Sequence, residues 1–85
     1  MKLKNIASNM SEVTLGNQNG EFVVLFSYST PVAYVQDGRW YRTAKHYSKT
    51  TTRHINKWLR LNNQEGAITC SQSWINNLVT EGYHV

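Results

Sequence analysis

Positively charged side chains between residues 39 and 60 carry the clearest chemistry in this sequence. Seven of the nine Lys and Arg residues of the 85-residue chain fall there, and the nearest acidic residues on either side are Asp37 and Glu65. A cluster of one sign is typical of proteins that bind a polyanion. The alternative is a solubilising surface, which would also agree with the formal net charge of +4.

These residue types suit the binding of nucleic acid. Lys and Arg neutralise phosphates, while polar and aromatic side chains contact bases. An asparagine among the cations would pair with an adenine edge if its helix lay in a major groove. An acidic surface on a host protein would be bound equally well by the same charges. For nucleic acid we expect phosphate contacts and base reading from Arg39, Arg42, Lys45, Lys49, Arg53, Asn56, Lys57 and Arg60, with stacking by Trp40, Tyr41 and Tyr47.

Catalysis needs titratable groups that converge in a pocket, and the sequence gives little sign of them. Only five carboxylates are present, and three of them directly precede a glycine at an expected turn. Cys70, the single cysteine, is expected to be a small core residue. The three histidines lack metal-ligand spacing, and His54 is expected to be a hydrogen-bonded residue at the edge of an apolar face. We therefore expect no enzyme activity, no metal site and no cofactor.

Residues 48–61 must position most of these cations, and their spacing predicts an amphipathic helix. Ser48 is a suitable N-cap. At 100° per residue, the four Lys and Arg residues of the segment fall within an arc of about 80°. Ile55, Trp58 and Leu59 fall on the other side, so we expect this side to pack on a sheet.

Residues 12–44 are expected to form that sheet, as a four-stranded antiparallel meander. Asp37-Gly38 is typical of a two-residue hairpin turn. Pro31 indicates a bend, a bulge or the start of a strand, because proline cannot donate to a ladder. On the last strand, alternation places Trp40 and Arg42 on one face and Tyr41 and Thr43 on the other. β-branched and aromatic residues predict the four strands at 12–15, 21–28, 32–36 and 39–44.

The two ends of the chain complete the predicted fold. Residues 1–11 contain few apolar residues and are expected to form an N-terminal arm. A second helix is expected over 69–81, because Thr69-Cys70-Ser71-Gln72 matches a capping box. The sequence therefore predicts one α+β domain, in which a small antiparallel sheet precedes two helices and one helix packs on the sheet.

Two segments resemble motifs of short bacteriophage and prophage proteins. They are "LFSYSTPVAY" (25–34) and "YSKTTTRHINKWL" (47–59), within a similarity that spans roughly residues 5 to 61. The resemblance implies a phage origin and a role in the host cytoplasm, and it implies no catalytic residue. The expected architecture is also similar to the DNA-binding domains of phage integrases and AP2-type plant factors, in which the sheet enters the groove.

We therefore expect a small non-enzymatic phage accessory protein that binds nucleic acid through residues 39–60. The alternative is a protein-interaction module that inhibits or redirects a host enzyme or defence complex. A homodimer is a third expectation, through an edge strand at 12–15 or 39–44. The start of the chain lacks an apolar signal region, and the longest apolar run is "FVVLF". These features predict a cytoplasmic protein without a membrane span.

Overall fold

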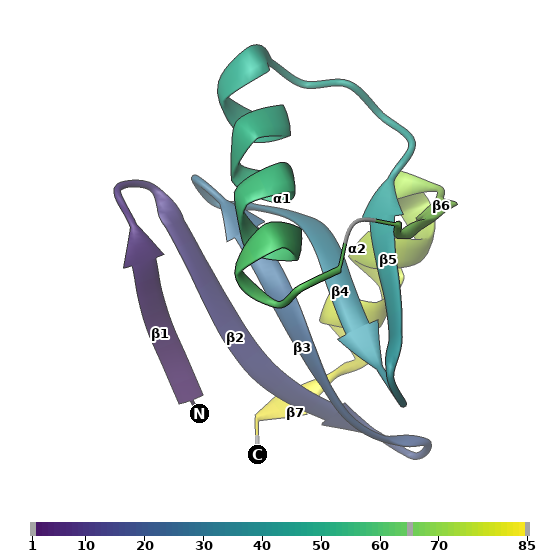
Figure 1. Cartoon of the computed structure of the whole chain (residues 1–85). Helices are drawn as coiled ribbons and strands as arrows, with labels where there is room; N and C mark the ends of the chain where they lie inside the picture. Colours follow the sequence, from purple (N-terminus) through teal and green to yellow (C-terminus); the bar gives the residue numbers. More distant parts are fainter. Residues whose placement is uncertain (1, 65, 85) are drawn as a thin grey trace.

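The chain folds into a β-sheet and two helices (Figure 1). The structure is a computed structural model that describes residues 2–64 and 66–84. The first five strands precede the first helix, and two further strands follow it. The elements are β1 (Lys2–Ala7), β2 (Met10–Asn17), β3 (Gly20–Ser27), β4 (Thr30–Gln36), β5 (Arg39–Thr43), α1 (Lys49–Leu61), β6 (Ile68–Cys70), α2 (Gln72–Glu81) and β7 (Tyr83–His84).

Two-residue turns connect the first five strands into an antiparallel meander. The predicted hairpin at residues 37–38 is confirmed: Asp37 and Gly38 have φ of 52° and 74°, as a type I′ turn requires. The β3–β4 turn places Tyr28 at φ 58°, which is rare for a bulky side chain. Pro31 pairs with Phe26 in β4, where the β3–β4 register shifts. The shift is the bulge that this proline indicated.

The expected N-terminal arm is wrong, because residues 2–7 form β1 and pair with β2. The meander therefore has five strands rather than four. Only two apolar side chains, Leu3 and Ile6, mark β1 before its final alanine. The strand pairs with β2, and Ile6 and Ala7 pack against the core.

The sheet is also mixed rather than purely antiparallel. β6 pairs with β5 in parallel, with Tyr41 opposite Ile68, and β7 pairs with β2. The strand order is β1-β2-β3-β4-β5-β6. The strands expected to be open edges, 12–15 and 39–44, lie instead within β2 and β5, and both have neighbours on either side. Among the described strands, β1 and β6 end the order, so the two segments are not the edge strands that the sequence predicted.

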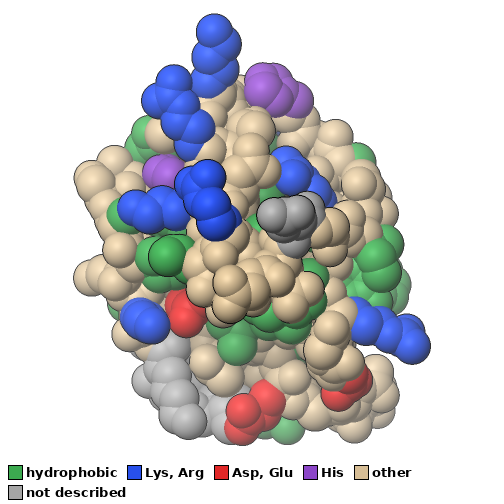
Figure 2. All heavy atoms as spheres, viewed as in Figure 1, with side chains coloured by type: hydrophobic (Ala, Val, Ile, Leu, Met, Phe, Trp, Pro, Cys, Tyr) green, Lys and Arg blue, Asp and Glu red, His purple; other side chains and the backbone are tan. Residues whose placement is uncertain are grey.

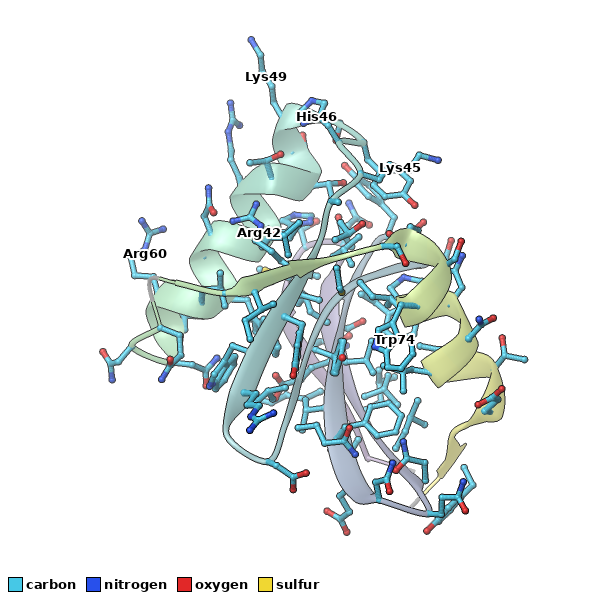
Figure 3. All side chains as sticks on the ribbon, turned by 90° about the vertical axis from the view of Figure 1, so that its right-hand side faces the viewer. Arg42, Lys45, His46, Lys49, Arg60 and Trp74 are labelled. Atoms are coloured by element: carbon cyan, nitrogen blue, oxygen red, sulfur yellow. The ribbon has the colours of Figure 1, made fainter. Side chains whose placement is uncertain are left out.

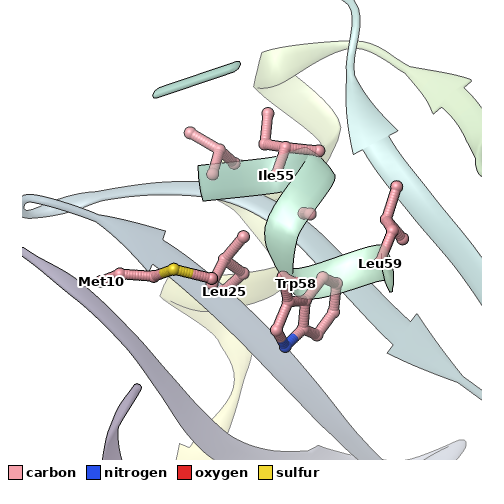
Figure 4. Packing of buried hydrophobic residues seen from close by; sticks show 7 residues of the cluster. Met10, Leu25, Ile55, Trp58 and Leu59 are labelled. Carbon is pink, nitrogen blue, oxygen red and sulfur yellow. The ribbon is translucent and has the colours of Figure 1, made fainter. Parts of the chain in front are cut away.

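α1 connects β5 to β6 and packs on one face of the sheet. Trp58 is 1% exposed, and it packs with Ile55 and Leu59 against Met10 and Leu25 of the sheet (Figure 4). Burying each large apolar side chain stabilises the fold by about 1.5–3 kcal/mol. The predicted N-cap is confirmed, since Ser48 Oγ accepts a hydrogen bond from the backbone N–H of Thr51 at 3.1 Å.

α2 covers the opposite face, so helices lie on both sides of the sheet. Ile75 packs there against Leu15, Phe22 and Val24. The helix begins at Gln72 rather than Thr69, because residues 68–70 extend the sheet as β6 and Ser71 supplies the cap to Trp74 N–H at 3.1 Å. Neither helix found in residues 2–64 and 66–84 is long and apolar enough to cross a membrane.

Candidate nucleic-acid interface

The outer side of α1 carries a row of exposed cations. Lys49, Arg53, Lys57 and Arg60 are all exposed, while the other side of the helix is buried in the core. Figure 2 shows Lys and Arg side chains gathered over α1, with the acidic side chains of that view lying lower on the molecule. Successive positions four residues apart rise by about 6 Å along the axis, so the row can follow an extended chain of negative charges.

Arg42 joins this row from the sheet. Its Nη1 donates to Asn56 Oδ1 across 3.2 Å, which turns a β5 cation toward the helix (Figure 3). Asn56 is exposed on α1 between the positions of Arg53 and Lys57. Its side-chain oxygen therefore already accepts a hydrogen bond from Arg42 in the absence of nucleic acid. We call this surface the cationic face; it consists of Arg42, Lys49, Arg53, Lys57 and Arg60 with Asn56.

Arg39 does not join the cationic face. It begins β5 opposite Gln36, beside the hairpin at 37–38. Three residues of strand separate it from Arg42 by about 10 Å, and alternation turns its side chain to the other face of the sheet. The structure thus separates two cations that the sequence placed in one track.

Lys45 lies in the loop between β5 and α1. Its Nζ is 4.8 Å from the ring centre of Tyr47, within the range of a cation–π contact. In Figure 3 the side chain points away from α1. Lys45 therefore adds charge beside the cationic face rather than along the helix.

Only one of the three predicted stacking residues lies with the cations. Trp40 packs against Trp58 of the core, with ring centres 5.0 Å apart. Tyr41 stacks on Tyr34 at 4.6 Å on the α2 side of the sheet. Tyr47 is 38% exposed in the loop that precedes α1. It is the candidate that keeps an accessible ring close to the helix.

A polar network beneath α1 was not anticipated from the sequence. Ser27 is 1% exposed, and its Oγ lies 2.7 Å from His54 Nδ1 and 3.0 Å from Thr51 Oγ1. Burial lowers the pKa of His54, and the charge of Lys57 lowers it further. His54 is therefore the hydrogen-bonded boundary residue expected from its place on the helix. Strand alternation places Ser27 on the same face of β3 as Leu25. This pattern could have indicated from the sequence that Ser27 lies under α1.

Residues 1–77 match DUF8033, a family of unknown function. The chain belongs to this family. The matched region contains both β5 and α1, and hence the whole cationic face. No curated protein and no solved structure matches the chain.

Two further chemically active groups of this DUF8033 protein, Glu12 and Cys70, lie against the core. Trp58 Nε1 donates to Glu12 Oε2 at 2.8 Å, so this carboxylate satisfies a core indole. Burial raises the pKa of the Cys70 thiol, which keeps it protonated and poorly nucleophilic near neutral pH. In the described ranges, no three His, Cys, Asp or Glu side chains are grouped as metal ligands would be.

Proposed function

We propose that this DUF8033 protein is a non-enzymatic nucleic-acid-binding protein and that it binds through the cationic face. The bond between Arg42 and Asn56 is the observation that carries the proposal, because it links the sheet cation to the helix row. Figure 2 shows several Lys and Arg side chains close together over α1. A phage origin and a role in the host cytoplasm belong to the same proposal and rest on the sequence resemblance alone.

Charge repulsion on α1 supports a binding role. Lys49 and Arg53, and Arg53 and Lys57, are like-charge pairs four residues apart on an exposed helix. Such pairs cost helices a few tenths of a kcal/mol each. A merely solubilising helix reaches the same solubility with mixed signs. A helix that docks a polyanion instead recovers this cost in the complex, where phosphates lie between the cations.

The helix, rather than the sheet, would make the contacts. α1 covers one face of the sheet and α2 covers the other. The sheet-in-groove mode of integrase and AP2-type domains needs an open sheet face near Trp40, and this indole packs on Trp58. Asn56 would orient Arg42 toward phosphate rather than read adenine, since its oxygen already accepts from the guanidinium.

Salt-dependent binding to a labelled oligonucleotide tests the proposal. Each phosphate contact to a duplex contributes a slope of about −0.9 to log affinity against log salt, so four helix cations give about −3.6. The double variant Arg53→Glu/Lys57→Glu should remove about half of this slope and weaken binding to every sequence alike. Fluorescence anisotropy at increasing NaCl measures both effects.

Arg39→Glu is the control for the single variant Arg53→Glu, because both make the same change of charge and only Arg39 lies away from the cationic face. We expect it to alter the slope by much less than either helix substitution. An affinity that does not change between low and physiological salt would exclude the proposed function. Equal effects of Arg39→Glu and Arg53→Glu would show that total charge, and not this face, drives binding.

A second candidate is the protein-interaction module. It is favoured by Trp74 on the α2 side, which is 55% exposed while its Nε1 donates to Tyr34 OH at 2.8 Å. Partly exposed aromatic side chains held in place are typical anchors of protein interfaces. A single stoichiometric host protein captured from nuclease-treated lysate by the wild type, and lost on Trp74→Ala, would favour this candidate over nucleic acid.

A further inference from the structure

A hollow of about 200 Å³ lies beside the cationic face. It is bounded by the end of β5, the loop that follows and the first half of α1. Arg42 belongs to both the hollow and the cationic face, so the two are continuous.

The residues that line the hollow include an apolar side chain at its floor and side chains with planar groups. Ile55 contributes its buried aliphatic side chain. Arg42, His46 and Tyr47 contribute a guanidinium, an imidazole and a phenol ring. These are the side-chain planes on which unstacked bases are commonly held. Lys45 Nζ lies over one face of the Tyr47 ring, so a base would stack on the opposite face.

The threonine hydroxyl groups of the lining are already engaged within the protein. Thr43 Oγ1 accepts from Lys45 N at 3.1 Å, and Thr52 Oγ1 donates to Ser48 O at 3.1 Å. Thr51 Oγ1 lies within hydrogen-bond distance of Ser27 Oγ and Ser48 Oγ. The hollow therefore offers aromatic rings and positive charge, while its threonine hydroxyl groups are occupied within the protein.

We infer that the hollow holds one unstacked base of a single-stranded nucleic acid whose phosphates follow the α1 cations. The inference rests on the proposed function and adds the form of the ligand. A duplex keeps its bases inside the stack, so it would contact the row on α1 and leave the hollow unfilled. Because stacking accepts every base, binding shows little sequence preference.

The test compares one labelled oligonucleotide as a single strand and as a duplex, in DNA and in RNA, at one fixed salt concentration. The wild type should bind the single strand more tightly. Tyr47→Ala should lower single-strand affinity about tenfold, as the loss of one stacked base does. The same variant should leave duplex affinity unchanged. Tyr47→Phe keeps the ring and should keep the wild-type single-strand affinity.

Tyr83→Ala is the matched control, since Tyr83 is 59% exposed in β7 and lies outside the hollow. It should bind both ligands as the wild type does. The inference is overturned if Tyr47→Ala leaves the affinity for the single strand unchanged, or if it lowers the affinities for the single strand and the duplex equally. Salt-dependent binding of both ligands would then still support the proposed function. Binding of neither ligand by the wild type would overturn the proposed function and the inference together.

Discussion

Asn56 shows how the setting of one side chain changes the chemistry suggested by its type. An exposed asparagine among cations favours base reading, yet its oxygen accepts a hydrogen bond from Arg42. The free energy that a base would gain from this amide is reduced by the bond that must first be broken. Asn56 is therefore better suited to hold a guanidinium in position than to recognise adenine.

His54 makes the stability of the protein depend on pH. Its Nδ1 contacts the buried Ser27, Tyr28 lies with its ring centre 5.9 Å away, and burial and Lys57 lower its pKa from 6.5. The unfolded chain therefore binds a proton at a higher pH than the folded protein does. The contribution of the neutral His54 to stability is fully present above about pH 6.5. It is lost as the pH decreases from there through the pKa of His54 in the folded protein.

Urea unfolding at pH 7.5 and pH 5.5 measures this loss. The wild type should be less stable at the lower pH. His54→Gln keeps a polar group near Ser27 without a titrating ring, so its free energy of unfolding should change less between the two pH values. A pH dependence identical to that of the wild type would assign the effect to other groups.

At the scale of elements, α1 and the strands from 10 to 43 were largely predictable from local pattern. Ser48 marked the start of α1, and the Asp37-Gly38 dipeptide fixed the β4–β5 hairpin. β1, β6 and β7 were missed because they have little apolar pattern of their own. The three residues of β6 are a strand only because they pair with β5. Such pairings link distant parts of the chain, which local propensity does not report.

The cap of α1 provides a test at this scale. Ser48→Ala removes the side-chain acceptor of the Thr51 N–H, and loss of an N-cap costs about 1 kcal/mol. Because Trp58 and Ile55 of α1 lie in the core, the loss should lower the stability of the whole domain in urea unfolding. Ser73→Ala, at an exposed position within α2, should leave stability unchanged or slightly higher. Equal destabilisation by both variants would argue against a capping role.

At the scale of the whole molecule, the β5–α1–β6 crossover assembles the candidate interface. Alternation alone correctly placed Arg42 and Trp40 on one side of β5, which is the side that α1 covers. The sequence did not indicate that α1 would return the chain in parallel to the next position in the sheet. This return brings Asn56 within reach of Arg42. The residues of the cationic face could therefore be named from the sequence, whereas the contact between its strand and helix parts could not.

Gly82 fixes the C-terminal segment to the rest of the molecule. Its φ is −71°, so glycine is not needed there for its backbone conformation. A Cβ would lie 3.0 Å from Leu78 O and 3.1 Å from Phe22 Cζ. Gly82→Ala should therefore destabilise the protein by about 1–3 kcal/mol through overpacking.

Gly66→Ala is the matched control for this substitution, because no described atom lies within 4 Å of its added methyl group. It should be neutral or slightly stabilising, since alanine restricts the unfolded chain. Thermal or urea unfolding of both variants checks the difference. Similar stability of the two variants would mean that α2 moves away from the sheet at little cost.

The pairing of β1 and β7 with the same strand has a practical consequence for protein engineering. Lys2 lies opposite Thr14 and His84 opposite Leu15, which are consecutive residues of β2. A short peptide linker would therefore close the chain into a ring, and new ends could be opened at the exposed Gln18-Asn19 turn. A dye or fusion partner attached beside Lys2 or His84 would lie away from the first turn of α1 (Figure 1).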